Sequence, residues 1–334
     1  MDIKTYQPDS SASELTQLLR KKYGSNKNFD YFLSDFKKAL NFCINNENVL
    51  FYPIAGFENG KMSAHIALII DTRLSAGEAF FGFFEFPDDT SAFHLLWNSL
   101  VKEARNNGIS VLKGPVNGSI WHQYRSIKET DNSPFFKAEL FCESYYYDFL
   151  ISNKPINEVL YYSAYREPFD NVLQMIGEGA YDTLVSSGFS IQAKKTITLD
   201  ELRTIGGISK AVFHDSWGYT ELNEQEFMQL YSSEKLATHL SSLYVLYKGC
   251  EIIGFCSTSK EDNRTLICKT ICIVPLYQGL GLGNALAYKV HFDAQRDGFK
   301  KMIYALIREG NSISNFPKEE AILFRRYATF EFQI

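Results

Sequence analysis

The sequence predicts an α/β protein (α+β, with mixed sheets) made of two tandem domains of similar architecture. The chain has 334 residues, which is long for a single hydrophobic core. Hydrophobic residues make up 45% and charged residues 22%, an ordinary balance for a globular protein. One order of strands and helices occurs in each half. We therefore place the domains at residues 1–187 and 188–334.

The first half contains three predicted strands, a helix and the start of a fourth strand. Apolar, β-rich runs predict the strands, and the helix carries its apolar residues on one face. Asn107 and Gly108 end this helix. In chain order the elements are the strands 49–53, 62–71 and 78–86, the helix 90–106, and a strand that begins at 110–112.

The second half repeats this plan. Asp200 is the expected N-cap of its first helix, and Gly298 ends its second. Lys248-Gly249-Cys250 connect the two strands of a hairpin. In chain order the elements are the strand 192–199, the helix 200–213, the strands 242–247, 251–258 and 265–274, the helix 282–297, and the strands 301–307 and 324–332.

Composition and charge argue against several classes of function. The formal charge is -5 and the longest basic run is Arg20-Lys21-Lys22, so nucleic acid is not an expected partner. No apolar run is long enough to span a membrane, so no membrane partner is expected either. The six cysteines include no C-x-x-C pair, which predicts no metal site and fits a cytoplasmic location. Nothing in the composition indicates the oligomeric state.

The most informative segment runs from residue 271 to residue 285. A buried strand leads into a loop with glycines at 279, 281 and 283, and a helix follows at once. The first N–H groups of a helix lack intrahelical partners, and its dipole favours negative charge there. Glycines let a phosphate approach those groups closely. The segment therefore predicts a pyrophosphate loop; the alternative is a glycine-rich start of a helix that binds no ligand.

Spacing separates three kinds of phosphate loop. A P-loop needs Gly-Lys-Ser/Thr, where this chain has Gly283-Asn284-Ala285. A dinucleotide fingerprint needs a glycine three residues after Gly281, where Asn284 stands. The third pattern, Gln/Arg-x-x-Gly-x-Gly/Ala, is met by Gln278, Gly281 and Gly283.

On these residues the segment resembles the coenzyme A loop of the GNAT acyltransferase superfamily. The resemblance implies acetyl-CoA or another acyl-CoA as co-substrate. It implies that the backbone of Ile273 and Val274 holds the pantetheine arm, with an N–H near Val274 as oxyanion donor. The other implied binding residues are Gln278, Gly279, Leu280, Gly281, Leu282, Gly283 and Asn284 around the pyrophosphate, with Asn311 and Asn315 beside the pantetheine. For the last two, helix capping is the alternative.

A wider resemblance covers most of the chain. Gly114-Pro115-Val116-Asn117, the tyrosine-rich 143–148 and Trp217-Gly218-Tyr219 are similar to a bacterial family of tandem GNAT-like proteins. In the first half the equivalent loop, 86–90, has no glycine and carries Asp88 and Asp89. Carboxylates there would repel a pyrophosphate. We expect this half to be a scaffold or an acceptor wall without a cofactor.

Acyl transfer to an amine needs a base, donors for the oxyanion and an acid for the thiolate. Related enzymes often carry the base on the strand before the glycine loop, but residues 265–274 include no acidic residue. Asp215 and Glu221, which flank Trp217-Gly218-Tyr219, are candidate bases, or ordinary loop carboxylates. Ser314, or its neighbour Ser312, is the candidate acid.

These observations predict an N-acyltransferase that moves an acyl group directly to a small amine. One alternative is a catalytically inactive CoA-binding or scaffold module, favoured by the missing strand carboxylate. Another is a tandem-domain transferase that uses a longer acyl-CoA or aminoacyl-tRNA. The glycine loop and the acidic balance argue against tRNA.

Overall fold

The computed structural model describes residues 1–5, 8–231, 242–310 and 321–334. The chain forms two compact units. Unit 1 comprises Met1–Tyr161, Trp217–Thr220 and Arg325–Ile334, and unit 2 comprises Tyr162–Ser216 and Glu221–Phe324. This division differs from the predicted boundary at 187/188. The chain passes from unit 1 to unit 2 within the strand Asn157–Arg166. Its last ten residues, most of them in the strand Ile322–Gln333, belong to unit 1 again.

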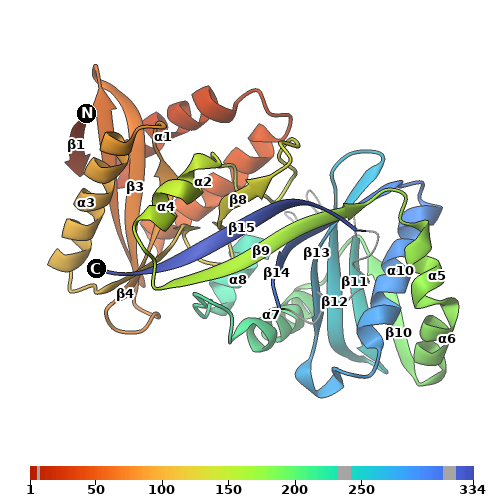
Figure 1. Ribbon diagram of the computed structural model, residues 1–334. Coiled ribbons are helices and arrows are strands. Elements are labelled where there is room, and N and C mark those ends of the chain that lie inside the picture. Colours follow the sequence, from red (N-terminus) through yellow and green to blue (C-terminus); the bar gives the residue numbers. More distant parts are fainter. Residues whose placement is uncertain (6–7, 232–241, 311–320) are drawn as a thin grey trace. The chain divides into compact units, whose positions relative to one another are not determined.

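Unit 1 contains a mixed sheet (Figure 1). In sheet order its strands are β1 (Asp2–Thr5), β2 (Val49–Glu58), β3 (Lys61–Asp71), β4 (Glu78–Glu85), β5 (Val111–Gly114), β15 (Ile322–Gln333) and β9 (Asn157–Arg166). Neighbours are antiparallel from β1 to β4, β5 runs parallel to β4, and β15 runs antiparallel to β5. β8 (Ser126–Thr130) also pairs with β15, and β6 (Val116–Asn117) pairs with β7 (Gln123–Tyr124).

Helices cover both faces of this sheet. Because successive strand residues point to opposite faces, Phe80 and Phe81 of β4 enter different layers. Phe80 belongs to the core formed with α1 (Pro8–Tyr23) and α2 (Phe29–Asn45). Phe81 packs edge to face on Trp97 of α3 (Thr90–Asn106), with 5.4 Å between ring centroids. The observed α3 has the predicted bounds.

A buried ion pair fixes β15 to unit 1. The guanidinium of Arg325 donates from Nη1 to both oxygens of Glu139, at 2.5 and 2.6 Å. The hydroxyl of Tyr327 and the backbone N–H of Phe136 also donate to this carboxylate, at 2.6 and 3.1 Å. Arg325 and Glu139 are both almost fully buried. Residues near the end of the chain are therefore part of the core of unit 1.

The described strands of unit 2 continue the order of the same 13-stranded sheet. In sheet order its strands are the end of β9, then β14 (Lys301–Arg308), β13 (Thr265–Ile273), β12 (Glu251–Lys260), β11 (Ser242–Lys248) and β10 (Phe189–Lys194). β13 and β14 are parallel, and the strands from β13 to β10 are antiparallel. Its helices are α5 (Asp170–Ile176), α6 (Glu178–Ser186), α7 (Leu199–Phe213), α8 (Glu224–Tyr231) and α10 (Leu282–Arg296). α5 and α6 lie beside α10 (Figure 1).

The start of α7 corrects a prediction. Asp200 is not the N-cap; Thr198 is. The hydroxyl of Thr198 accepts the N–H of Glu201 at 3.2 Å, and the Glu201 carboxylate accepts the N–H of Thr198 at 2.9 Å. This reciprocal capping box satisfies two N–H groups at once, so the helix starts before Asp200. The preceding strand correspondingly ends at Lys194, not at residue 199.

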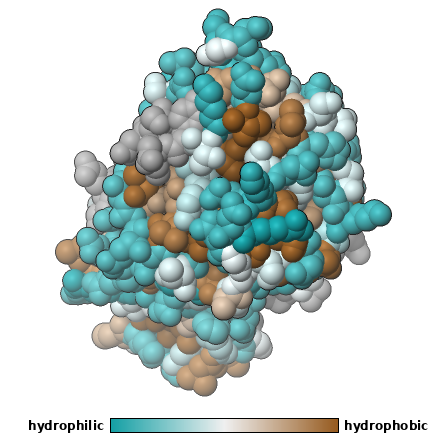
Figure 2. All heavy atoms as spheres, turned by 90° about the vertical axis from the view of Figure 1, so that its left-hand side faces the viewer, coloured by the Kyte–Doolittle hydropathy of each residue, from teal (hydrophilic) through white to brown (hydrophobic). Residues whose placement is uncertain are grey.

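The surface offers no single dominant feature on the face of the molecule drawn in Figure 2. Hydrophilic side chains cover much of this face, and separate hydrophobic groups lie between them. Scattered apolar groups are normal on folded proteins and indicate no function by themselves. None of the described helices is both long enough and apolar enough to span a membrane.

Candidate functional site

The candidate site in unit 2 begins where β13 and β14 separate. The two strands pair in parallel from Thr265 and Lys301 to Cys268 and Tyr304, and the pairing ends there. β13 continues to Ile273 against β12 alone. Farther along β14, the N–H of Leu306 instead donates to the hydroxyl of Ser163 on β9, at 3.0 Å. One edge of β13, from residue 269 to residue 273, is therefore left without its parallel neighbour.

The backbone of Ile273 is directed toward this edge. Val274 donates its N–H to the Ile253 carbonyl of β12 at 2.9 Å, and its own carbonyl accepts the N–H of Tyr277 at 2.9 Å. Both polar groups of Val274 are thus used inside unit 2. Strand residues alternate in direction, so Ile273 faces the open edge, where its carbonyl accepts Nε2 of Gln278 at 2.9 Å. Of the two predicted pantetheine residues, only Ile273 has its backbone turned toward the gap.

Gln278 and the glycines after it form a tight loop between β13 and α10. A short 3₁₀ turn, η1 (Pro275–Tyr277), comes first. Gly279 and Gly281 then take positive φ angles of 80° and 75°, a conformation that side chains disfavour. No atom of the described residues lies within 4 Å of a Cβ built at either glycine. The loop therefore leaves open space directly before the helix.

The first turn of α10 has N–H groups next to that open space that are not used in the helix. Gly281 is the N-cap and has no side chain that could cap the helix. The N–H groups of Asn284 and Ala285 donate to the Gly281 carbonyl, at 3.1 and 3.2 Å. The N–H groups of Leu282 and Gly283 precede the first intrahelical bonds and have no partner in the helix. Together with the positive end of the helix dipole, they suit an anionic group such as a pyrophosphate.

The remaining loop residues differ in exposure. The side chain of Leu282 is buried in the core of unit 2, which fixes the start of α10 against the sheet. Leu280 lies exposed on the loop, as does Leu276 in the preceding turn. Asn311, Asn315, Ser312 and Ser314 lie outside the described residues.

The two candidate bases are solvent-exposed. Asp215 is fully exposed, and one of its oxygens lies 3.1 Å from Nδ1 of His214. Glu221 is 66% exposed and lies 3.5 Å from Nζ of Lys210. Neither carboxylate has the buried environment that commonly tunes a general base.

A buried histidine near the point of separation was not singled out from the sequence. Nδ1 of His291 on α10 lies 2.7 Å from the Ala287 carbonyl, and Nε2 lies 2.7 Å from the hydroxyl of Tyr304. Burial lowers the pKa of His291 to about 4, so the ring is neutral. A carbonyl only accepts, so Nδ1 carries the proton and Nε2 accepts from Tyr304. Because Tyr304 is the last β14 residue paired with β13, this bond ties α10 to the point of separation.

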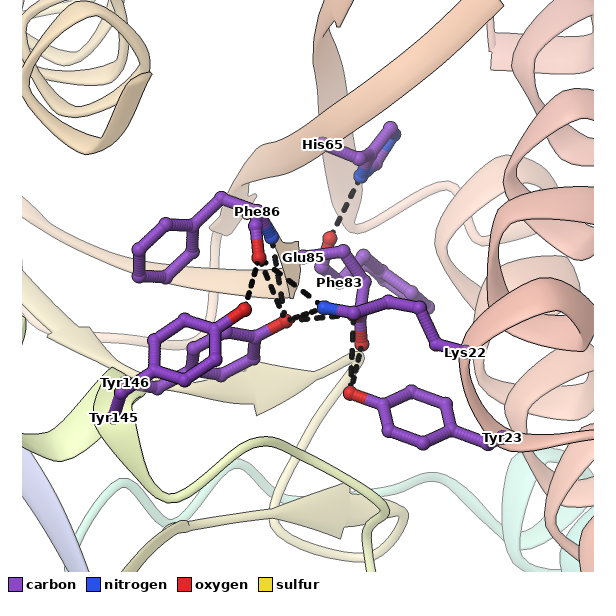
Figure 3. A network of polar contacts seen from close by, with 8 residues as sticks. All are labelled: Lys22, Tyr23, His65, Phe83, Glu85, Phe86, Tyr145 and Tyr146. Carbon is purple, nitrogen blue, oxygen red and sulfur yellow. Dashed lines mark hydrogen bonds and ion pairs between the residues drawn. The ribbon is translucent and has the colours of Figure 1, made fainter. Parts of the chain in front are cut away.

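The equivalent loop of unit 1 is occupied by the chain's own groups. Asp89 caps α3 by accepting the N–H of Ala92 at 2.7 Å. Around Phe86, the carbonyl accepts the hydroxyl of Tyr145 at 2.6 Å and the ammonium of Lys22 at 3.2 Å (Figure 3). Its N–H donates to the hydroxyl of Tyr146 at 3.3 Å. A carboxylate therefore stands before the first turn of α3, where the unit 2 loop has Gly281 without a side chain.

The gap between β4 and β5 in unit 1 is also filled. β4 and β5 pair only as far as Phe80 and Lys113. Beyond that point, a Cβ built on Gly82 would lie 1.8 Å from the Val116 carbonyl of β6. The backbone of β6 thus occupies the space beside β4, which leaves no room for an added extended arm there.

Glu85, at the end of β4, is the centre of the network in Figure 3. Its carboxylate lies 3.0 Å from Nζ of Lys22 and accepts the hydroxyls of Tyr146 and Tyr23, at 2.7 and 3.2 Å. Burial raises the pKa of Glu85, while Lys22 and the phenol donors act in the opposite direction. The ion pair and two hydrogen bonds therefore satisfy this buried carboxylate internally.

Comparison with known proteins found a matching family model and similar solved structures. Residues 209–315 match the family model described as the acetyltransferase (GNAT) family. No curated protein matches the chain. Among solved structures, a tandem GNAT protein from the clavulanic acid biosynthesis pathway has 10% identity and a TM-score of 0.61, over 99% of this chain and 98% of that one.

Two further structures are similar over nearly the whole chain. A GCN5-related N-acetyltransferase from Sphaerobacter thermophilus has 10% identity and a TM-score of 0.53, over 99% of this chain and 94% of that one. Its counterpart from Kribbella flavida has 10% identity and a TM-score of 0.53, over 98% of this chain and 70% of that one. At such identities the likeness concerns the fold, and it confirms the predicted tandem α/β architecture.

Proposed function

We propose that this chain, a tandem protein of the GNAT superfamily, is an acyl-CoA-dependent N-acyltransferase that binds acetyl-CoA in unit 2 and acylates a small amine. The observation that carries the proposal is the pairing of two features. The free N–H groups at the start of α10 suit a pyrophosphate, and the open edge of β13 next to them suits an extended arm. An acyl-CoA has both of these parts, because its pyrophosphate is joined to an extended pantetheine arm.

Different residues of unit 2 would bind the pyrophosphate and the pantetheine arm. The N–H groups from Gly279 to Gly283 would hold the pyrophosphate, and the backbone of Ile273 would pair with the pantetheine as an added strand does. Bound acyl-CoA supplies the activated thioester. Nε2 of Gln278 donates to the Ile273 carbonyl at 2.9 Å, and this hydrogen bond links the loop to the edge of β13. The chain's contribution at this stage is positioning.

The proton of the acceptor amine would leave through water. Asp215 and Glu221 remain the candidate carboxylates, and their exposure favours a solvent-mediated route over direct abstraction. The absence of an acidic residue from β13 favours the alternative, a CoA-binding module without turnover. Unit 1 would act as scaffold, since its own loop is occupied.

A turnover assay distinguishes these possibilities. The purified chain is incubated with acetyl-CoA and a panel of primary amines, with longer acyl-CoAs in parallel, and free thiol is measured. We expect acceptor-dependent thiol release from acetyl-CoA that Gly281→Asp abolishes. Binding without release for every acceptor would support the inactive module. A faster rate with longer acyl-CoAs would contradict acetyl-CoA as the donor.

A further inference from the structure

A residue of β14 just past the end of its pairing with β13 has a strained backbone. Leu306 has a φ of 58°, which lies in the left-handed region that favours glycine. It follows two residues after Tyr304, where the parallel pairing with β13 ends. Such a conformation persists only where the surrounding structure holds it, and it is frequent at functional sites. The contacts of Leu306 therefore bear on how the two strands separate.

Ser163 on β9 holds the backbone of Leu306. Its hydroxyl oxygen accepts the N–H of Leu306 at 3.0 Å, and Ser163 is fully buried. β9 and β14 are neighbours in the sheet (Figure 1), and both Ser163 and Leu306 belong to unit 2. In a regular strand a backbone carbonyl of the neighbouring strand would accept such an N–H. Here a side-chain oxygen accepts it, so the left-handed residue keeps a hydrogen bond.

Unit 1 contains a similar contact where its own parallel strands separate. Phe83 of β4 follows three residues after Phe80, where the pairing with β5 ends, and has a φ of 49°. Its N–H donates to Oδ1 of Asn117 at 2.6 Å, and its carbonyl lies 2.7 Å from Nδ1 of His65 (Figure 3). In unit 1 the backbone of β6 fills the space beside β4. Asn117 is therefore a matched control for Ser163.

The register of β13 and β14 indicates what the Leu306 conformation prevents. Cys268 is paired with Tyr304, so a straight continuation of the two strands would bring Thr270 opposite Leu306. Hydrogen bonds formed in that continuation would close the edge of β13 at 269–273. Extended strands have φ angles near -120°. The positive φ of Leu306 is incompatible with such a continuation and therefore keeps β14 from closing the edge.

We propose that Ser163 is a positioning residue for acyl-CoA, because it holds Leu306 in the conformation that keeps the edge of β13 open for the pantetheine arm. The inference rests on the proposed function, since it concerns the same strand edge. Ser163 acts through the backbone of Leu306 and not through contact with the ligand. The edge is open before binding, so no fraction of the protein has to open first.

Calorimetric titration with acetyl-CoA measures the effect on binding. Ser163→Ala removes the acceptor of the Leu306 N–H, so the strained backbone can relax and the open edge is less populated. We expect the dissociation constant to rise by roughly tenfold, the factor that corresponds to one buried hydrogen bond. Asn117→Ala removes the matching acceptor in unit 1 and should lower the melting temperature without changing the dissociation constant. An equal rise in both variants would overturn the proposal, since only general stability would then be altered.

A second substitution separates the backbone conformation from the side chain of Leu306. Glycine adopts a positive φ without strain, so Leu306→Gly makes the left-handed conformation accessible without the help of Ser163. In the background of Ser163→Ala, this substitution should restore most of the affinity for acetyl-CoA. Leu306→Ala removes nearly the same side chain but keeps the strain, and should restore none. Equal affinities of the two double variants would contradict a role for the backbone conformation.

Hydrogen exchange of the ligand-free chain distinguishes this inference from the proposed function. Because strand residues alternate in direction, the N–H groups of Ile271 and Ile273 face the open edge and that of Cys272 faces β12. Ser163→Ala should slow exchange at Ile271 and Ile273, because β14 can then pair with them, and leave Cys272 unchanged. If this slowing occurs but acetyl-CoA does not bind, the proposed function fails while Ser163 still controls the edge. Equal exchange in both proteins would overturn the role of Ser163, whatever the binding result.

Discussion

Replacing Arg325 by methionine is expected to lower the free energy of unfolding by about 3–5 kcal/mol, because it leaves a buried carboxylate without its cation. Glu139 accepts two hydrogen bonds from this guanidinium, at 2.5 and 2.6 Å, and both residues are almost fully buried. Tyr327 and Phe136 still donate to Glu139, but neither carries a charge. A loss of this size is a large fraction of the stability of an ordinary domain.

The next residue provides a matched control. Arg326 pairs with Glu129 at 2.7 Å, but both side chains are more than one-third exposed. Arg326→Met should therefore cost only about 0–1 kcal/mol. The double variant Arg325→Met/Glu139→Leu removes both buried charges and should recover most of the loss. Denaturant unfolding measures all three; equal losses for Arg325→Met and Arg326→Met would show that the buried pair does not hold β15.

Gly281→Asp is expected to weaken acetyl-CoA binding by about 100-fold or more. Its carboxylate would stand before the first turn of α10, where the free N–H groups lie, and would repel a pyrophosphate. Like charges about 4 Å apart repel by about 1 kcal/mol in water and by about 4 kcal/mol near a protein surface. A 100-fold loss corresponds to about 2.7 kcal/mol, which lies between these limits. Calorimetric titration with acetyl-CoA measures the change.

Backbone strain must be separated from charge in this experiment. Gly298 follows the other end of α10, has a φ of 87°, and likewise has no described atom within 4 Å of an added Cβ. Gly298→Asp therefore carries a similar backbone strain far from the loop and should retain wild-type affinity. Gly281→Asn introduces a side chain without charge and should lose less affinity than Gly281→Asp. Equal losses at Gly281 and Gly298 would mean that α10 has been destabilised, with no specific role for the loop.

The local elements could be predicted well from the sequence, because their signals are local. The apolar face of residues 90–106 and the Asp89 cap both give α3 its observed limits. The hairpin strands around Gly249 and the helix after Gly281 were also predicted. The N-cap of α7 was not, although the Thr198-x-x-Glu201 signature stands in the sequence. The β-branched residues Thr196, Ile197 and Thr198 favour a longer strand over that cap.

The division into units could not be predicted in the same way. β15 pairs with β5, and its Arg325 reaches Glu139, through contacts between residues more than 180 positions apart. Such pairing depends on strand register and on burial in the folded chain. The residues next to a strand in the sequence do not indicate which distant strand it will pair with. For the same reason nothing marks Arg125 as a buried cation, since arginines are mostly exposed. The neutral His291 on α10 is another case, because only its contact with Tyr304 makes it distinctive.

The most direct test of the central claim is the stoichiometry of acetyl-CoA binding to the full chain, measured by calorimetric titration. Unit 2 has free N–H groups beside an open strand edge, while the matching loop of unit 1 is held by Lys22, Tyr145 and Tyr146. We therefore predict one site per chain, with a dissociation constant on the order of micromolar. Two equivalent sites per chain, or no binding of acetyl-CoA or of longer acyl-CoAs, would contradict this account.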